Sequence, residues 1–210
     1  MACAAEYAGR SAPVHADDIG HWMDDGKLAH ALHEYSVRMV LVLQALHSQI
    51  GLVGAKLVQR QGAGLFVVGG GYTNNPKQLH YRGWDASQGP WHTFQVCPWV
   101  TFSCVYIKRE CIGAVGTMDM QVFPYARDTD YSRRAREDGF ANVYCPTAWA
   151  LHQQESTTVV LVMRAMSAKE WNDRSAESQR YFYFKWANRH APDVELPADI
   201  FAETQNWPGR

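Results

Sequence analysis

The spacing of hydrophobic residues changes along the chain, and each spacing predicts a different kind of secondary structure. In residues 27–49, apolar side chains such as Leu28 and Leu32 recur at three- and four-residue steps, without glycine or proline. This spacing predicts a helix with one apolar face, because side chains at those steps share one side of an α-helix. Shorter β-branched runs bounded by glycine follow at 50–59 and 64–72, and they predict buried strands.

The second half of the chain alternates in the same way. A strand is predicted between residues 99 and 107, and another, interrupted by Pro146, within residues 140–153. The stretch DTDYSRRAREDG, which starts at Asp128, predicts a helix that stops at its glycine. Residues 167–190 predict an amphipathic helix. Alternating strands and helices are typical of an α/β fold, which we therefore expect.

We expect one large domain with a short segment at either end. The chain has 210 residues, which is enough for one large domain, and no linker-like segment divides its middle. The predicted division is an N-terminal arm at 1–26, a single core domain at 27–190 and a C-terminal tail at 191–210.

Composition narrows the classes of function. The formal net charge is −1, so no overall positive charge favours a nucleic acid or an acidic membrane as partner. No apolar run approaches the ~20 residues that cross a bilayer. The five cysteines form no C-x-x-C pair and the N-terminus has no signal-like hydrophobic segment, which predicts reduced thiols in a cytoplasmic protein. The 8 Trp and 10 Tyr residues offer rings that can stack on sugars or fill a core.

The stretch PYARDTDYSRRAREDGF, residues 124–140, carries the clearest candidate chemistry. Asp128 and Asp130 stand directly before a basic helical run. Either aspartate could serve only the helix, since a carboxylate caps free backbone N–H groups and complements the positive end of the helix dipole. Alternatively, the pair lies at the mouth of a site, because α/β proteins gather their sites at strand ends. The residues alone leave both interpretations open.

Several motifs in one order resemble a known family. VYIKRE is followed by GAVGTMD, which ends at Asp119, then by RDTD at 127–130, by Gly139 and Phe140, and by a strand with a proline and His152. The series is similar to the later two-thirds of family 2 glycosyltransferases of the GT-A fold, including rhamnosyltransferase-like members. In that family a basic pair precedes GG-F-D, ED-x-D, a Gly-aromatic pair, a proline and a histidine. The resemblance implies a GT-A-like mixed sheet flanked by helices.

Two departures from the family pattern bear on function. Arg127 stands where the family has Glu. The chain also starts close to the point where the family's N-terminal nucleotide-binding half would end, so we expect that half to be short or missing. The chain would then be a fragment or a shortened form, and a second copy or a partner chain would complete the donor site.

The resemblance implies an inverting glycosyltransferase, which moves a sugar from a nucleotide-diphospho-sugar to a hydroxyl of a carbohydrate or another acceptor. Asp128 matches the aspartate of the family motif that acts as the base and takes the hydroxyl proton. Asp130 is expected to cap the helix or to orient the site, and Arg127 to pair with Asp128 or to contact phosphate. Asp119 is a further candidate for substrate binding.

A divalent metal, Mn²⁺ or Mg²⁺, is the expected cofactor, because it would stabilise the departing diphosphate. Its candidate ligands are Asp17, Asp18 and His152, although a solvated turn and a structural histidine are the simpler interpretations. Trp84 and Trp99 are candidate platforms for a sugar, with core packing as the alternative for each.

Two other functions remain open for the same residues. The chain could be a catalytically silent remnant that binds carbohydrate or a partner protein, or a glycoside hydrolase that uses paired carboxylates. The transferase hypothesis predicts that Asp128 and His152 face one cleft on the same side of the sheet. The remnant hypothesis predicts an incomplete donor site.

Overall fold

The computed structural model describes residues 48–61, 64–69, 71–72, 84–85, 93–123, 126–152, 166–197 and 199–201. The predicted helix at 27–49, the arm at 1–26 and the candidate ligands Asp17 and Asp18 lie outside the described residues. Within the described ranges, no helix is long and apolar enough to cross a membrane.

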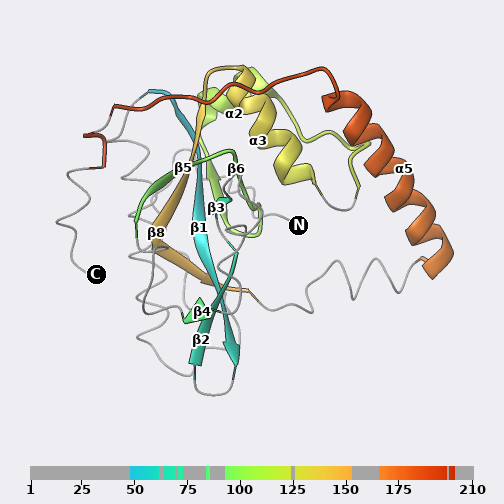
Figure 1. Ribbon diagram of the computed structural model, residues 1–210, viewed down its shortest axis with the longest axis horizontal. Coiled ribbons are helices and arrows are strands. Elements are labelled where there is room, and N and C mark those ends of the chain that lie inside the picture. The colour runs from blue at the N-terminus through green and yellow to red at the C-terminus, as the bar shows by residue number, and fades with distance from the viewer. Residues whose placement is uncertain are drawn as a thin grey trace.

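A mixed sheet forms the centre of the domain (Figure 1). Its middle strand, β1 (Ile50–Gln61), runs parallel to β8 (Ala141–Leu151) on one side and antiparallel to β7 (Val105–Ile107) and β2 (Gly64–Gly69) on the other. The outer strands are β4 (Trp84–Asp85), beside β2, and β5 (Gln95–Cys97), antiparallel to β8. A second sheet pairs β3 (Gly71–Tyr72) with β6 (Trp99–Val100). The predicted α/β class is confirmed, and the arrangement is compatible with part of a GT-A-like fold.

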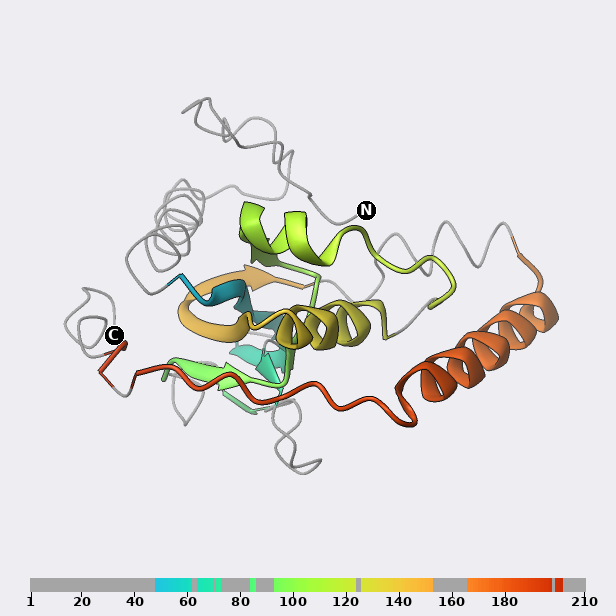
Figure 2. The ribbon, with the colours of Figure 1, turned by 90° about the horizontal axis from the view of Figure 1, so that it is seen from above.

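The described residues contain three helices. Two of them, α2 (Arg109–Val115) and α3 (Arg127–Glu137), lie between β7 and β8 in the chain. They form part of the crossover that two parallel strands, here β1 and β8, require. The third, α5 (Ala168–Trp186), stands away from the sheet in both views (Figures 1 and 2).

Most predicted elements of the described part are confirmed, with three corrections. The strand predicted over residues 64–72 is divided between the two sheets, because β2 ends at Gly69 in the first sheet and β3 pairs with β6 in the second. The single strand predicted over residues 99–107 is divided into β6 and β7 by a turn at 102–103. In this turn region Ala55 N–H donates to the carbonyl of Cys104 at 3.1 Å, so the bend is held against β1. Helix α2 was not predicted, and Cys111 is its one buried residue.

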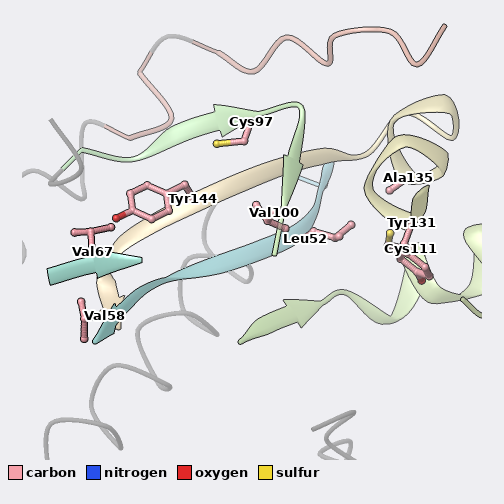
Figure 3. Close-up of a cluster of buried hydrophobic side chains, with 9 residues drawn as sticks. All are labelled: Leu52, Val58, Val67, Cys97, Val100, Cys111, Tyr131, Ala135 and Tyr144. Carbon is pink, nitrogen blue, oxygen red and sulfur yellow. The ribbon is translucent and has the colours of Figure 1, made fainter. Parts of the chain in front are cut away.

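Apolar side chains cover both faces of the sheet. On the face that carries α2 and α3, nine buried residues from seven elements form one cluster (Figure 3): Leu52, Val58, Val67, Cys97, Val100, Cys111, Tyr131, Ala135 and Tyr144. On the other face Ile50, Val53 and Val143 pack with Ile200 from the C-terminal segment. The close approach of β6 needs a glycine in β1, because a Cβ at Gly54 would lie 2.7 Å from that of Val100.

Strand β8 is irregular at its middle. Cys145 lies opposite Ala55, but the next partner, Lys56, lies opposite Trp149, so residues 146–148 are additional to the ladder. The strand curves strongly along its length (orange in Figure 2). This bulge lies where the sequence predicts an interruption by Pro146.

The C-terminal segment is packed against the domain over its described residues. The buried guanidinium of Arg136 in α3 donates to the carbonyls of Ala191 and Pro192, each at 2.8 Å, and to the Asp193 carboxylate. Further along, Phe201 stacks on Phe94 with ring centres 5.5 Å apart. The division into arm, core and tail stays a prediction, but this part of the predicted tail is anchored.

Candidate functional site

The start of α3 is built from an unusual backbone turn. Its cap residue, Ala126, has a left-handed conformation (φ 71°) and gives no side-chain cap. A non-glycine residue in this conformation carries strain of ~1–2 kcal/mol, and such residues concentrate at functional sites. The N–H of Asp130 donates to the Ala126 carbonyl at 2.8 Å and closes the first turn. Neither Asp128 nor Asp130 is the cap residue, so the capping alternative for Asp130 is wrong, and its role in orienting the site stays a prediction.

Asp128 lies in the first turn of α3 with its carboxylate partly buried. Its Oδ1 accepts the N–H of Thr129 at 2.8 Å. Burial raises the pKa of Asp128, and hydrogen bonding to the carboxylate lowers it only in part. A carboxylate with a raised pKa is a stronger base, which suits a group that removes a proton.

The expected pair between Arg127 and Asp128 does not form. The Nε of Arg127 donates to the carbonyl of Val122, and its guanidinium lies 5.6 Å from the centre of the Phe123 ring. Among the described residues, no lysine or arginine forms an ion pair with Asp128. The carboxylate therefore keeps the basicity that burial confers.

Asp130 is fully buried and has three donors. Its Oδ1 accepts Trp186 Nε1 at 2.9 Å and Lys185 Nζ at 2.8 Å, and its Oδ2 accepts Arg134 Nε at 3.0 Å. Two of these donors belong to α5, so Asp130 joins α3 to α5. A buried carboxylate is tolerated only when it is paired and hydrogen-bonded in this way.

Asp119 is tied to α5 by the same lysine. Its Oδ2 accepts Lys185 Nζ and the Tyr181 hydroxyl, both at 2.8 Å, while its Oδ1 accepts the N–H of Gln121 at 2.9 Å. Partial burial alone would raise the pKa of Asp119, but these hydrogen bonds, with that of Lys185 the strongest, lower it to about 2. The predicted role of Asp119 in substrate binding stays a prediction.

Lys185 thus bridges two carboxylates that come from different segments, although the sequence did not single it out as a site residue. The available signal was the run RYFYFKW, in which Tyr181 and Lys185 lie four residues apart. Residues at that step share one face of a helix. The sequence could not tell that this face meets Asp119 and Asp130.

His152 follows the last residue of β8. Its backbone N–H donates to the carbonyl of Val58 at 2.7 Å, while its side-chain Nδ1 is buried and finds no hydrogen-bond partner among the described residues. An unpartnered ring nitrogen suits a metal ligand. In the described ranges no three His, Cys, Asp or Glu side chains gather closely enough to hold a metal. No described hydrogen bond or ion pair joins His152 to Asp128, and their common cleft stays a prediction.

The two candidate tryptophans come from short strands. Trp99 is partly buried in β6 opposite Tyr72, and Trp84 lies in β4 opposite Val67. The side chain of Trp84 lies outside the described part.

Comparison with known proteins gives a partial match. No family model matches the chain. Over 60 residues the chain is 35% identical to N-acetylglucosaminyl-diphospho-decaprenol L-rhamnosyltransferase of Mycobacterium tuberculosis, in strain CDC 1551 / Oshkosh and equally in strain ATCC 25618 / H37Rv. The match covers 29% of this chain and 20% of each relative, so the chain spans about a fifth of their length. The chain is related, distantly, to glycosyltransferases.

That relationship agrees with the motifs from which the sequence predicted it. Asp128 is a partly buried carboxylate at the strained helix start, and no described lysine or arginine pairs with it. The neighbouring acidic residues Asp119 and Asp130 are engaged by the chain's own lysine, Lys185. Of the three aspartates, Asp128 is therefore the one that has no ion pair among the described residues.

Proposed function

We propose that this chain takes part in an inverting transfer of a sugar from a nucleotide-diphospho-sugar to a hydroxyl group, with Asp128 as the base. The observation that carries the proposal is the environment of Asp128, whose pKa is raised by burial and which no described cation neutralises. The partial similarity to a rhamnosyltransferase supports the reaction class.

In the proposed reaction, the acceptor hydroxyl donates its proton to Asp128 while its oxygen bonds to the anomeric carbon. The bond from that carbon to the diphosphate oxygen breaks, and the nucleoside diphosphate leaves with the electron pair. We further propose that Arg127 contacts the diphosphate and that Asp119, Trp84 and Trp99 help to place the sugars. Asp130 would orient the site through α3.

We also propose a divalent cation, Mn²⁺ or Mg²⁺, whose positive charge would stabilise the leaving diphosphate. His152 would hold it through its Nδ1, which is buried and has no hydrogen-bond partner among the described residues. Asp17 and Asp18 are proposed as the carboxylate ligands. A second copy or a partner chain is proposed to complete the donor site.

The names of the relatives indicate which acceptor and which sugar donor to test first. The relatives are named for the transfer of L-rhamnose to an N-acetylglucosaminyl-diphospho-decaprenol. We propose a sugar hydroxyl on a diphospho-lipid as the first acceptor to test, and an activated L-rhamnose as the first donor.

The first test is calorimetric titration of the chain with nucleoside diphosphates and nucleotide sugars, with and without Mn²⁺. Binding that Mn²⁺ strengthens supports the transferase. Absence of binding with either metal would favour a silent remnant that binds carbohydrate or a partner. The engagement of Asp119 and Asp130 by Lys185 favours that second candidate over a glycoside hydrolase, because it leaves Asp128 without a second available carboxylate from this motif.

The second test is Asp128→Asn, assayed with the donor that binds. Transfer should fall by a factor on the order of 10² to 10⁴, the usual range for loss of a general base. The melting temperature should stay the same or rise slightly, since an ionised carboxylate in a buried position opposes folding. Asp138→Asn, at the exposed C-terminal end of the same helix, is the matched control. Full transfer by Asp128→Asn would remove the assignment.

A further inference from the structure

Helix α5 has few buried side chains of its own. Of its residues Ala168–Trp186, only Ser178 and Trp186 are buried, and Phe184 and Tyr183 are 84% and 70% exposed. It stands beside the domain rather than upon the sheet (Figures 1 and 2). What holds it there is therefore a set of specific contacts, and most of these contacts go to one stretch, residues 119–130.

Both ends of that stretch form ion pairs with one atom of α5, the Nζ of Lys185. Lys185 Nζ lies 2.8 Å from Asp119 Oδ2 and 2.8 Å from Asp130 Oδ1. Tyr181 adds a second bond to the first end, and Trp186 adds a second bond to the other. The side chain of Lys185 is only 14% exposed, so water screens these ion pairs weakly.

The middle of the stretch is held by the same helix. The N–H of Phe123 donates to Ser178 Oγ, and its ring packs edge-on against Trp171 with centres 5.4 Å apart. The Arg174 guanidinium lies 5.1 Å from the centre of the Phe123 ring. Contacts at Asp119, Phe123 and Asp130 thus fix the stretch along the length of α5.

Asp128 lies inside this fixed stretch but points elsewhere. Each residue turns an α-helix by about 100°, so side chains two residues apart project from nearly opposite sides. Asp130 faces α5, whereas Asp128 Oδ1 accepts the N–H of Thr129 within its own turn. The contacts of Lys185 and Trp186 with Asp130 therefore fix the orientation of the helical turn that carries Asp128.

We propose that α5 acts as a clamp that places Asp128 for reaction, and that Lys185 is the positioning residue that couples the two. The inference rests on the proposed function of Asp128 as a base. Lys185 does not touch the reacting atoms. Without its ammonium group, the two carboxylates lose the cation between them and repel each other, and each end of the stretch keeps only its second bond to α5, from Tyr181 or Trp186. A misplacement of about 1 Å at a reacting group can reduce a rate by about 10²-fold.

The test measures the titration of Asp128 itself by carbon NMR of its carboxyl group, with the resonance assigned from Asp128→Asn. In Lys185→Met we expect the pKa of Asp128 to fall toward the ordinary value, because the loosened turn exposes the carboxylate to water. Loss of a positive charge with no movement would raise that pKa instead. The sign of the shift therefore separates displacement from simple electrostatics. Lys185→Arg should keep most of the wild-type value.

Two further variants keep the test decisive. Lys169→Met removes an exposed lysine of the same helix and should leave Asp128 unchanged. Tyr181→Phe deletes one bond to Asp119 but keeps Lys185, and should lower the pKa of Asp128 by less than Lys185→Met does. If Lys185→Met does not fold, Tyr181→Phe is the variant that tests the proposal. A lower melting temperature with an unchanged or raised pKa of Asp128 would mean that α5 only stabilises the domain, and would overturn the proposal.

Where a donor is known, the same variants should separate positioning from binding. Lys185→Met should lower kcat by about 10²-fold, with little change in the KM for the donor. Unchanged kcat would also overturn the proposal. The titration needs no substrate, so it can succeed even if Asp128→Asn shows that Asp128 is not the base. Failure of the clamp and failure of the proposed function are thus separate results.

Discussion

The sheet core and the junction, where α5 contacts Asp119, Phe123 and Asp130, are held together by different forces. In the core, Ile50, Leu52 and Val143 are wholly buried, and burial of each such side chain contributes roughly 1.5–3 kcal/mol without any directional requirement. At the junction, Asp130 is equally buried, but it is stabilised by a lysine, an arginine and a tryptophan that must each reach a particular oxygen.

This difference predicts which substitutions destabilise each region. A core that loses one methyl group loses stability in proportion to the volume removed. A junction that loses one partner keeps a buried charge with nothing to pair it, which costs far more than the pair contributed. The stability of the junction should therefore depend on single charge changes and on pH. The stability of the core should depend on the size and shape of its side chains.

The largest expected effect is that of Asp130→Ala. The change removes the acceptor of Trp186 Nε1 and of Arg134 Nε and leaves Lys185 with Asp119 as its remaining carboxylate partner, and should lower the free energy of unfolding by ~3–5 kcal/mol. Urea denaturation measures it. The matched control is Asp173→Ala, whose exposed pair with Lys169 should contribute only ~0.3–0.5 kcal/mol. Equal losses in the two variants would show that burial of Asp130 adds nothing to the strength of its pairs.

In the core, Gly54→Ala should cost ~1–3 kcal/mol through overpacking, because the new Cβ would lie 2.7 Å from the Cβ of Val100. Val100→Ala makes room for it, so the double variant should be more stable than the sum of the two single losses predicts. A denaturation cycle over the four proteins measures this coupling. Strictly additive losses would show that β6 moves aside freely.

Acid should loosen the junction before it affects the core. The pKa of Asp119 is about 2 in the folded protein, below the ~3.9 of an unfolded chain. A lowered pKa stabilises the fold above about pH 4, and that contribution disappears as pH falls toward 2. Asp119 is partly solvated, so the effect should be smaller than that of Asp130→Ala.

Thermal melts of the wild type and Asp119→Asn, from about pH 6 to about pH 2.5, measure this contribution. The wild type should melt higher near pH 6, and the two curves should converge in acid. A gap that stays constant over the whole range would show that Asp119 does not supply it by ionisation.

The smallest expected effect is a gain in stability. Gly113 lies inside α2, and a Cβ there would meet no atom within 4 Å. Gly113→Ala should therefore stabilise the domain by ~0.5–1 kcal/mol, because alanine loses less backbone entropy on folding. Gly139→Ala is the opposite case, since its φ of 82° disfavours a side chain. Melting temperatures that move in the same direction for both variants would refute the reasoning.

Elements with a strong local pattern were predictable from the sequence. The β-branched run of β1, the helix that ends before Gly139 and the amphipathic helix α5 are all present. Helix α2 was not predictable in the same way, because its sequence RECIGAV is short and contains glycine and β-branched residues, which are poor helix formers. It is stabilised by the burial of Cys111 in the core.

For the site, one of the two alternatives predicted for each of two residues is wrong. Arg127 was expected to pair with Asp128 or to contact phosphate, and it bonds to Val122 instead of Asp128. Asp130 was expected to cap the helix or to orient the site, and it anchors α5 instead of capping α3. Local pattern cannot make this distinction, because every residue in the first turn of a helix has nearly the same sequence neighbours. The phosphate contact and the orienting role stay predictions.

The sequence by itself determined the long strands β1 and β8, the longer helices and the presence of three acidic side chains near the start of α3. These features depend on propensities and spacings within a few residues of one another. Tertiary structure alone decided which carboxylate stays available. Asp119 and Asp130 are neutralised by Lys185, 66 residues from Asp119 in the chain, whereas Asp128 turns away from that lysine. Charge pairing over that separation exists only after α5 docks, because it depends on distance in space rather than on order in the chain.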